Sequence, residues 1–220
     1  MIKITNTEVT GWAAAIRGMR NPMNSWDKSD TDINWLYDDV YIGNNDLKLM
    51  KKLAKAGSDE AKYKRFIVVT CDITAPLYWW KEFDTYKVGT VANSTSTMHR
   101  IHAKEFDLTD FSYHHISLNT YVDVGGAWSV PPMSTFKQTM SQLNAMRELY
   151  LQTKDKFYWW NMIQLLPSSY NQLRTIQFNY QVLTNMYHAR KNHKLDEWRD
   201  LCKWIESLPY SELITGGGVE

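Results

Sequence analysis

The sequence predicts a single α+β domain that spans residues 1–220. Strand-like and helix-like stretches are mixed along the chain without the regular alternation of a doubly wound parallel sheet, and no stretch of linker composition divides it. No motif repeats at a period of roughly 20–50 residues, which argues against a solenoid or a propeller. A chain of 220 residues is long enough to bury a sizeable core in one such domain.

The first third of the chain predicts a strand, a helix, a loop and a second helix. Residues 1–9 alternate between apolar and polar side chains, which is typical of a strand with one buried face. Residues 10–19 (TGWAAAIRGM) favour a short helix, and the turn-rich residues 20–31 favour a loop. A helix is expected over residues 46–55, with Gly57 at its end.

The middle of the chain contains the clearest strand signal. Residues 65–73 (RFIVVTCDI) are β-branched, apolar and bounded by polar residues. Ala75 and Pro76 are expected to begin a helix, because proline is favoured in a first helical turn. Residues 87–97 are small and polar and favour a loop. Short strands or irregular loop are expected over 106–123, and a turn over 124–132.

The last part of the chain predicts mainly helices. Ser134 is expected to cap a long helix over residues 136–152, and a second helix follows over 155–166. A strand at 169–178 and helices at 179–190 and 195–206 complete the prediction, with a frayed tail at 211–220 that ends in three glycines, Val219 and Glu220.

Composition narrows the choice of cellular context and partners. The net charge of +1 implies no broad attraction to nucleic acid or to an acidic membrane. No signal peptide opens the chain and no stretch approaches about 18 consecutive apolar residues, so a soluble cytoplasmic protein is expected. Cys71 and Cys202 lie far apart in apolar runs, as expected for buried, reduced thiols. The 10 Trp and 13 Tyr suit a core with oligomer contacts, or stacking on a planar ligand.

The densest set of polar side chains at helical spacing lies within residues 165–205. Asn179, Leu183, Met186 and Arg190 follow one another on one predicted helical face, and Asn185 lies nearby. Carboxamides and a guanidinium on a partly apolar face need partners when they are buried. The face is therefore either a polar network at a subunit contact or a ligand site.

A second candidate is the predicted loop at residues 87–100. It places hydroxyl and amide side chains between Lys87 and Arg100, and this combination suits a phosphate group. The same composition is also typical of a solvated polar loop.

Other catalytic and metal-binding patterns are missing from the sequence. The histidines His99, His102, His114 and His115 have no carboxylate at ligand spacing, so no metal site is expected. No GxSxG, Walker A or GxGxxG motif occurs, and neither cysteine has a histidine close in sequence.

Two stretches resemble the motifs of a known family. In the first, a predicted strand leads into Ala75-Pro76, and residues 85–97 (TYKVGTVANSTST) have the length of the signature RHRxxSxNExSxR. In the second, Leu166-Pro167 precedes an extended piece and a helix, and the matching positions there are Asn179, Leu183, Asn185, Arg190, His193 and Glu197. Together they are similar to the flavin-dependent thymidylate synthases, the ThyX family.

The resemblance implies an α+β domain with a central, mostly antiparallel sheet flanked by helices. It further implies a homotetramer that binds FAD between subunits and reductively methylates dUMP to dTMP, with methylenetetrahydrofolate and NADPH as co-substrates. No nucleic-acid polymer or membrane is implied as a partner.

The resemblance also implies a role for individual residues. Arg190 would bind the uracil ring of dUMP and polarise it, which makes it the expected catalytic residue. The implied flavin-binding residues are Asn179, Asn185, Tyr86, Lys87 and His193. The implied phosphate-binding residues are Lys87, Thr90, Thr95 and Ser96.

Residues 85–97 depart from the family signature. Thr85, Tyr86 and Lys87 stand where the signature has Arg, His and Arg, and Thr97 stands where it has its last Arg. These replacements leave two alternatives open. One is a related one-carbon transfer, such as hydroxymethylation, on another pyrimidine deoxynucleotide. The other is a non-catalytic oligomeric relative that binds nucleotide or flavin.

Overall fold

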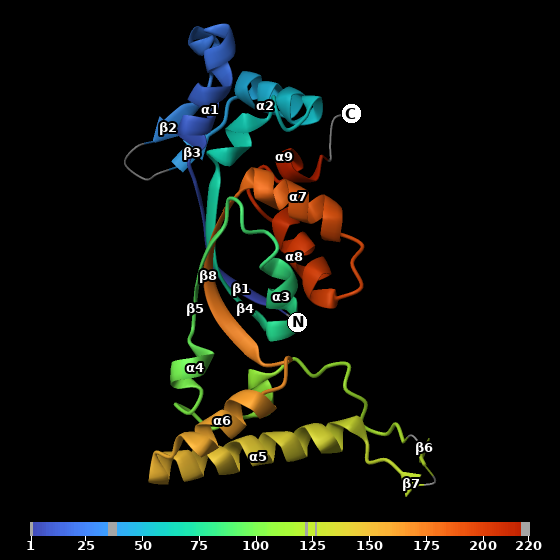
Figure 1. The fold of residues 1–220 in the computed structure, drawn as a ribbon. Coiled ribbons are helices and arrows are strands. Elements are labelled where there is room, and N and C mark those ends of the chain that lie inside the picture. Colours follow the sequence, from blue (N-terminus) through green and yellow to red (C-terminus); the bar gives the residue numbers. More distant parts are fainter. Residues whose placement is uncertain (1, 35–38, 122, 126, 217–220) are drawn as a thin grey trace. The chain divides into compact units, whose positions relative to one another are not determined.

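The computed structural model describes residues 2–34, 39–121, 123–125 and 127–216. Its central feature is a four-stranded antiparallel sheet in the order β1-β4-β8-β5, flanked by helices (Figure 1). The four strands are β1 (Lys3–Thr10), β4 (Val68–Pro76), β8 (Asn171–Asn179) and β5 (Val91–Ser94). The predicted fold class, α+β with a mostly antiparallel sheet, is confirmed.

The contacts within the chain group into two compact units. Unit 1 comprises residues 74–83 and 94–173, and unit 2 comprises residues 2–73, 84–93 and 174–216. The boundaries fall within β4, β5 and β8, so each of these strands contributes residues to both units.

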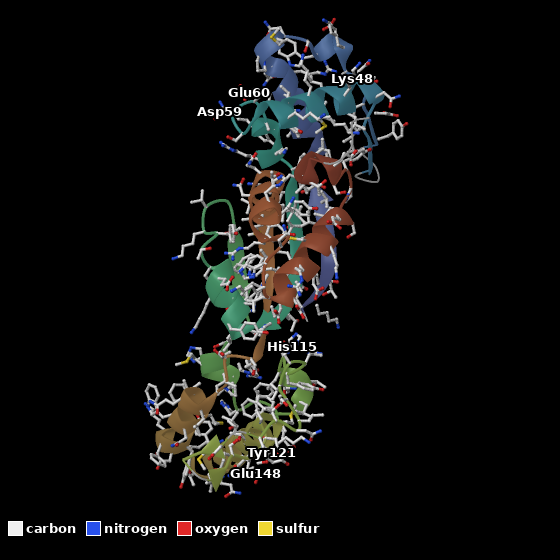
Figure 2. All side chains as sticks on the ribbon, turned by 90° about the vertical axis from the view of Figure 1, so that its right-hand side faces the viewer. Lys48, Asp59, Glu60, His115, Tyr121 and Glu148 are labelled. Carbon is white, nitrogen blue, oxygen red and sulfur yellow. The ribbon has the colours of Figure 1, made fainter. Side chains whose placement is uncertain are left out.

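Unit 2 contains β1 and the helices at both ends of the chain. Its helices are α1 (Trp12–Arg20), α2 (Asn44–Ala56), α7 (Tyr180–Arg190), α8 (Asp196–Glu206) and α9 (Glu212–Thr215). Three 3-10 turns, η1 (Asn21–Met23), η2 (Trp26–Lys28) and η3 (Lys62–Arg65), and the short hairpin of β2 (Asp32–Asn34) and β3 (Asp39–Tyr41) connect them. Lys48 on α2, and Asp59 and Glu60 in the turn that follows it, are labelled in Figure 2.

The core of unit 2 follows the predicted patterns. Alternate residues of β4, Val69, Cys71 and Ile73, are fully buried, as expected for a strand with one face against the core. The apolar stripe of α8 is buried in the same way, with Trp198 and Leu201 inaccessible to solvent. The strand predicted at 65–73 and the helix predicted at 195–206 are thus confirmed, with boundaries shifted by at most three residues.

Unit 1 is built on a helical hairpin. Its elements are α3 (Leu77–Phe83), α4 (Thr97–Arg100), η4 (Leu108–Asp110), β6 (Asp123–Val124), β7 (Ala127–Trp128), α5 (Pro132–Thr153) and α6 (Lys156–Leu165). Lys154 ends α5 in the left-handed conformation, and Asp155 caps α6 by accepting a hydrogen bond of 2.9 Å from Phe157 N. Phe111, Phe136, Leu143 and Met162 belong to its buried apolar cluster. His115, Tyr121 and Glu148 of this unit are labelled in Figure 2.

Three local predictions are wrong. Ala75 and Pro76 end β4 instead of starting a helix, and α3 begins at Leu77, whose N–H donates to Tyr170 O at 2.9 Å. Ser134 lies inside α5, which begins at Pro132, where the missing N–H of proline costs nothing. Residues 91–94 form β5 rather than loop, because the neighbouring β8 supplies backbone partners that a local pattern does not reveal.

A buried ion pair organises the loop at residues 20–31. Arg20 Nε donates to Asp46 Oδ1 at 2.6 Å, and both side chains are almost inaccessible to solvent. Ser29 Oγ and Thr31 Oγ1 each donate to Asp46 Oδ2 at 2.6 Å. Burial acts to raise the pKa of Asp46, but the hydrogen bonds from Ser29, Thr31 and Arg20 and the charge of Arg20 outweigh it and hold this pKa below its ordinary value.

Both cysteines are buried free thiols, as predicted. Burial raises the pKa of Cys71 to about 12 and that of Cys202 to about 11, so both remain protonated at neutral pH. In the part of the chain that the structure describes, no helix is both long and apolar enough to cross a membrane. The frayed tail predicted at 211–220 is wrong for residues 212–215, which form α9 because Leu213 and Ile214 are buried. Residues 217–220 lie outside the described residues.

Candidate functional site

The junction of β8 and α7 places the first predicted site residue. Asn179 is the last residue of β8 and the N-cap of α7, and its Oδ1 accepts a hydrogen bond of 3.0 Å from Val182 N. The expectation that Asn179 shares a helical face with Arg190 is therefore wrong, because Asn179 precedes the helix. Leu183 and Met186, from the same predicted face, are fully buried in the core of unit 2.

Arg190 lies against two aromatic rings at the C-terminal end of α7, and the two rings pack edge to face with their centroids 5.8 Å apart. Its Nε donates a hydrogen bond of 2.9 Å to Tyr86 Oη. Its guanidinium carbon lies 4.5 Å from the ring centroid of Trp198 and 5.6 Å from that of Tyr86. Such cation–π contacts orient a guanidinium while keeping it charged. We call Tyr86, Arg190 and Trp198 the Arg190 cluster.

His193 lies in the connection between α7 and α8. Its Nδ1 accepts a hydrogen bond of 3.2 Å from Leu195 N, and its backbone N–H donates to Arg190 O at 2.9 Å. The imidazole lies 6.2 Å from the Trp198 ring, centroid to centroid. His193 therefore adjoins the Arg190 cluster, and its Nδ1 accepts the hydrogen bond that closes the turn at Leu195.

The segment between α3 and β5 runs along α7. Tyr86 meets Arg190 in the last turn of α7, and Thr90 Oγ1 donates back to Tyr86 O. Gly89 has a φ of +80°, and a Cβ built there would lie 2.9 Å from Val182 Cγ2 and 3.3 Å from Asn179 Nδ2, at the opposite end of α7. Glycine adopts this positive φ without strain, and its lack of a Cβ leaves room for the side chains of Val182 and Asn179.

A cavity of about 290 Å³ opens beside this glycine. Its lining residues are Val68, Gly89, Thr90, Val91, Gln177, Phe178 and Asn179. The volume is near the lower end of the range for small-molecule sites, about 300–1,000 Å³. Within unit 2 the cavity is large enough for a ring system but not for a whole dinucleotide.

A buried acceptor next to Asn185 is a feature that the sequence pattern did not reveal. Gln181 Nε2 donates to Asn185 Oδ1 at 3.1 Å, whereas Gln181 Oε1 is buried and has no hydrogen-bond partner among the described residues. A buried orphan acceptor costs about 1–3 kcal/mol, which a donor on a ligand or another chain would recover. The i, i+4 spacing of the two carboxamides is the signal that could have identified Gln181.

Of the other residues predicted to bind phosphate, one is exposed and two form hydrogen bonds within the protein. Lys87 is exposed in the segment that runs along α7. Thr95 and Ser96 belong to unit 1, where Thr95 N donates to Leu173 O at 2.9 Å and Ser96 Oγ caps α4 by accepting from His99 N at 3.0 Å. Among the described residues, no group of three or more His, Cys, Asp or Glu could hold a metal ion.

Comparison with known proteins gives no match to a protein-family model or to a curated protein sequence. Solved structures do match. The flavin-dependent thymidylate synthase ThyX of Helicobacter pylori, complexed with FAD and dUMP, superimposes with a TM-score of 0.67 over 97% of both chains at 16% identity. The chain has the ThyX fold. The resemblance inferred from the sequence is thus confirmed at the level of the fold.

Two further structures with the ThyX fold are similar to this chain. A second structure of the Helicobacter pylori protein with FAD and dUMP gives a TM-score of 0.67 over 98% of this chain and 97% of that one, at 16% identity. A UMP/dUMP methylase, PolB of Streptomyces cacaoi, bound with 5-Br dUMP, gives a TM-score of 0.59 over 99% and 95% at 13% identity. The ThyX fold therefore carries proteins that are described by different activities.

Proposed function

We propose that this protein is a flavoenzyme that reductively methylates dUMP to dTMP as a homotetramer, with methylenetetrahydrofolate and NADPH as co-substrates. The observation that carries the proposal is the Arg190 cluster, a guanidinium fixed by Trp198 and Tyr86 in a chain with the ThyX fold. The Helicobacter pylori protein of the same fold is complexed with FAD and dUMP, which supports both ligands.

The residues of unit 2 fit a flavin. No described residue donates a hydrogen bond to the buried Gln181 Oε1, and the turn at Gly89 leaves the Asn179 amide beside a cavity of about 290 Å³. Asn179, Asn185, Tyr86, Lys87 and His193 are the proposed FAD-binding residues. When bound, FAD supplies the redox chemistry that links NADPH to the pyrimidine.

Arg190 is the proposed catalytic residue. The pyrimidine ring becomes a nucleophile only when negative charge builds up on it, as in an enolate, and a guanidinium that is already oriented stabilises this charge without reorganisation. Attack on the one-carbon electrophile then consumes the charge as the new carbon–carbon bond forms. Arginine keeps its positive charge throughout the physiological pH range, so the site needs no base in a special protonation state.

The nucleotide phosphate is proposed to bind at Lys87, Thr90, Thr95 and Ser96. Lys87 is an exposed point charge, and the three hydroxyl side chains are hydrogen-bond donors of the kind that a phosphate accepts. The two thiols are not proposed as nucleophiles, because burial raises the pKa of Cys71 and of Cys202 well above neutrality.

A second candidate is a related one-carbon transfer, such as hydroxymethylation, on another pyrimidine nucleotide. The likeness to the UMP/dUMP methylase PolB favours it, because that protein shows that the ThyX fold is not tied to one substrate. Assays with UMP, dUMP and dCMP, with the product mass measured, separate this candidate from methylation of dUMP.

The flavin is tested first on the purified full-length protein. We expect a yellow protein, or a colourless one that takes up FAD stoichiometrically and shows the flavin absorption spectrum. Titration with dUMP is then expected to perturb this spectrum, because the residues proposed to bind the uracil ring and the flavin all lie in unit 2. A protein that neither contains nor takes up FAD contradicts the proposed function.

Gly89 provides a structural test of the flavin site. We expect Gly89→Val to weaken FAD binding by at least about tenfold, because the side chain collides with Val182 and Asn179 in a φ region disfavoured for β-branched residues. The FAD dissociation constant is measured by fluorescence quenching. Gly216→Val is the matched control, since Gly216 has a φ of +72° and a Cβ built there meets no atom within 4 Å. Equal weakening in both variants would mean that backbone strain alone causes the loss.

A further inference from the structure

His102 lies in unit 1, in the connection after α4, and packs against α5. Its ring centroid is 4.9 Å from that of Tyr150, in an edge-to-face arrangement. Lys154 Nζ lies 5.8 Å from the centroid of the same tyrosine ring, and Arg147 Nε donates a hydrogen bond of 3.0 Å to His102 O. Arg147 in α5 and Lys154 at its C-terminal end thus place two cationic side chains near one histidine, and Arg100 ends α4 two residues before it.

Three positively charged side chains act on His102. Burial, followed by the charges of Lys154, Arg100 and Arg147, lowers the pKa of His102 from its usual value. The three charged side chains that contribute to this lowered pKa are all cationic. At neutral pH the ring is therefore uncharged, and the cations around it repel one another without compensation from the histidine.

A second observation is independent of charge. The Nδ1 atom of His102 is buried and has no hydrogen-bond partner among the described residues. A buried ring nitrogen without a partner is costly, because its interaction with water has been lost. A ligand, or a water held by a ligand, would supply the missing partner.

Other charges in unit 1 are arranged differently. Lys104 pairs with Asp110 at 2.5 Å and with Asp107 at 3.7 Å, which is the usual arrangement on a protein surface. In contrast, none of Arg100, Arg147 and Lys154 forms an ion pair with any described residue. A mixed solvated surface would intersperse both signs of charge, so this group is more like an anion site than like ordinary surface.

We propose that Arg100, Arg147 and Lys154, grouped around His102, form a binding site for a small anion with two or more negative charges. The site lies in unit 1, whereas the proposed flavin and uracil residues lie in unit 2. One proposed phosphate-binding residue, Ser96, caps the helix that ends at Arg100, which is why the binding test is made with dUMP bound. Such an anion neutralises the repulsion between the three cations and favours protonation of His102, which then becomes a fourth donor. The shared chemistry is that of a pyrophosphate group or of a short run of carboxylates.

Calorimetric titration of the full-length protein with inorganic pyrophosphate tests the site. The solution contains saturating dUMP, so that the nucleotide phosphate cannot account for the heat. We expect saturable binding that weakens at least about tenfold in the variant Arg100→Gln/Lys154→Gln. The control Lys137→Gln/Lys156→Gln removes the same charge from exposed positions of α5 and α6 and is expected to change binding less than about twofold.

Triglutamate serves as the second probe and separates the two sources of anion. Tighter binding of pyrophosphate indicates a phosphate ligand, and tighter binding of triglutamate indicates a polycarboxylate. The proposal is overturned if neither probe gives saturable heat. It is also overturned if the two double variants lose the same affinity for pyrophosphate. Because FAD uptake is measured separately, failure of the anion site and failure of the proposed function give different results.

The pKa of His102 is a further measurement, and non-specific binding of pyrophosphate to surface cations would not change it. Its imidazole signal is followed by NMR across pH and assigned by its loss in His102→Gln. Pyrophosphate is expected to raise the pKa of His102, and by linkage its affinity rises as the pH falls through this pKa. An unchanged His102 titration in the presence of bound pyrophosphate contradicts a site centred on this residue.

Discussion

Replacing Arg190 with alanine is expected to lower kcat for dUMP methylation by roughly 100- to 1,000-fold, the usual effect of removing a preorganised charge stabiliser. The change removes the only group proposed to stabilise negative charge on the uracil ring. It also removes the hydrogen bond to Tyr86 and the contact with Trp198, so the free energy of unfolding is expected to fall by about 1–2 kcal/mol. Steady-state kinetics and thermal unfolding measure the two effects separately.

Three further variants isolate the cause. Lys191→Ala removes an exposed cation one position further on and is expected to leave kcat unchanged. Arg190→Lys keeps the charge but loses the planar stacking on Trp198, so it is expected to recover only part of the activity. Tyr86→Phe removes only the hydrogen bond to Nε. If Arg190→Ala keeps normal kcat, or merely unfolds the protein, Arg190 is a structural residue and not a catalytic one.

The largest loss of stability is expected for Asp46→Ala. The change leaves the guanidinium of Arg20 buried without its carboxylate and removes the acceptor of Ser29 and Thr31. Breaking a buried ion pair in this way costs about 3–5 kcal/mol, which is a large part of the stability of an ordinary domain. Urea unfolding at neutral pH measures the difference.

Asp59→Ala is the matched control. Asp59, labelled in Figure 2, is an exposed carboxylate in the turn after α2, and its loss is expected to change stability by less than about 0.5 kcal/mol. The pH dependence gives a second check. Because the pKa of Asp46 is lower in the folded protein, its contribution is present above the unfolded pKa of about 3.9 and is lost as the pH falls through the folded value. Equal losses in the two variants would show that the ion pair contributes little.

The strands and helices that the sequence predicts well are those with a strong local period. α8 and β4 can be predicted from the sequence because each buries one face. Burial of one face requires apolar residues at a regular spacing along the chain. β5 was not predicted, because it has no buried face and therefore no regular spacing of apolar residues. Its residues, Val91–Ser94, are all exposed, so no alternation marks them, and only pairing with β8 makes them a strand.

The candidate site is predicted only in part. The sequence indicates Asn179, Asn185 and Arg190 through spacing and resemblance. It does not indicate that Asn179 caps α7, that Gln181 keeps a buried acceptor without a partner among the described residues, or that Trp198 stacks on Arg190. The spacing of Trp198 places it in an apolar stripe, and such a pattern does not distinguish a core ring from one that also contacts a cation.

By itself, the sequence determined the type and order of most helices and strands, the α+β class and the positions that resemble the ThyX motifs, because these depend on residues close together in the chain. The tertiary structure decided which side chains meet. Tyr86 and Arg190 are 104 positions apart, and Arg20 and Asp46 are 26 apart. No local period links such pairs. They form only when packing of the core brings distant segments together and the buried polar groups must then find partners.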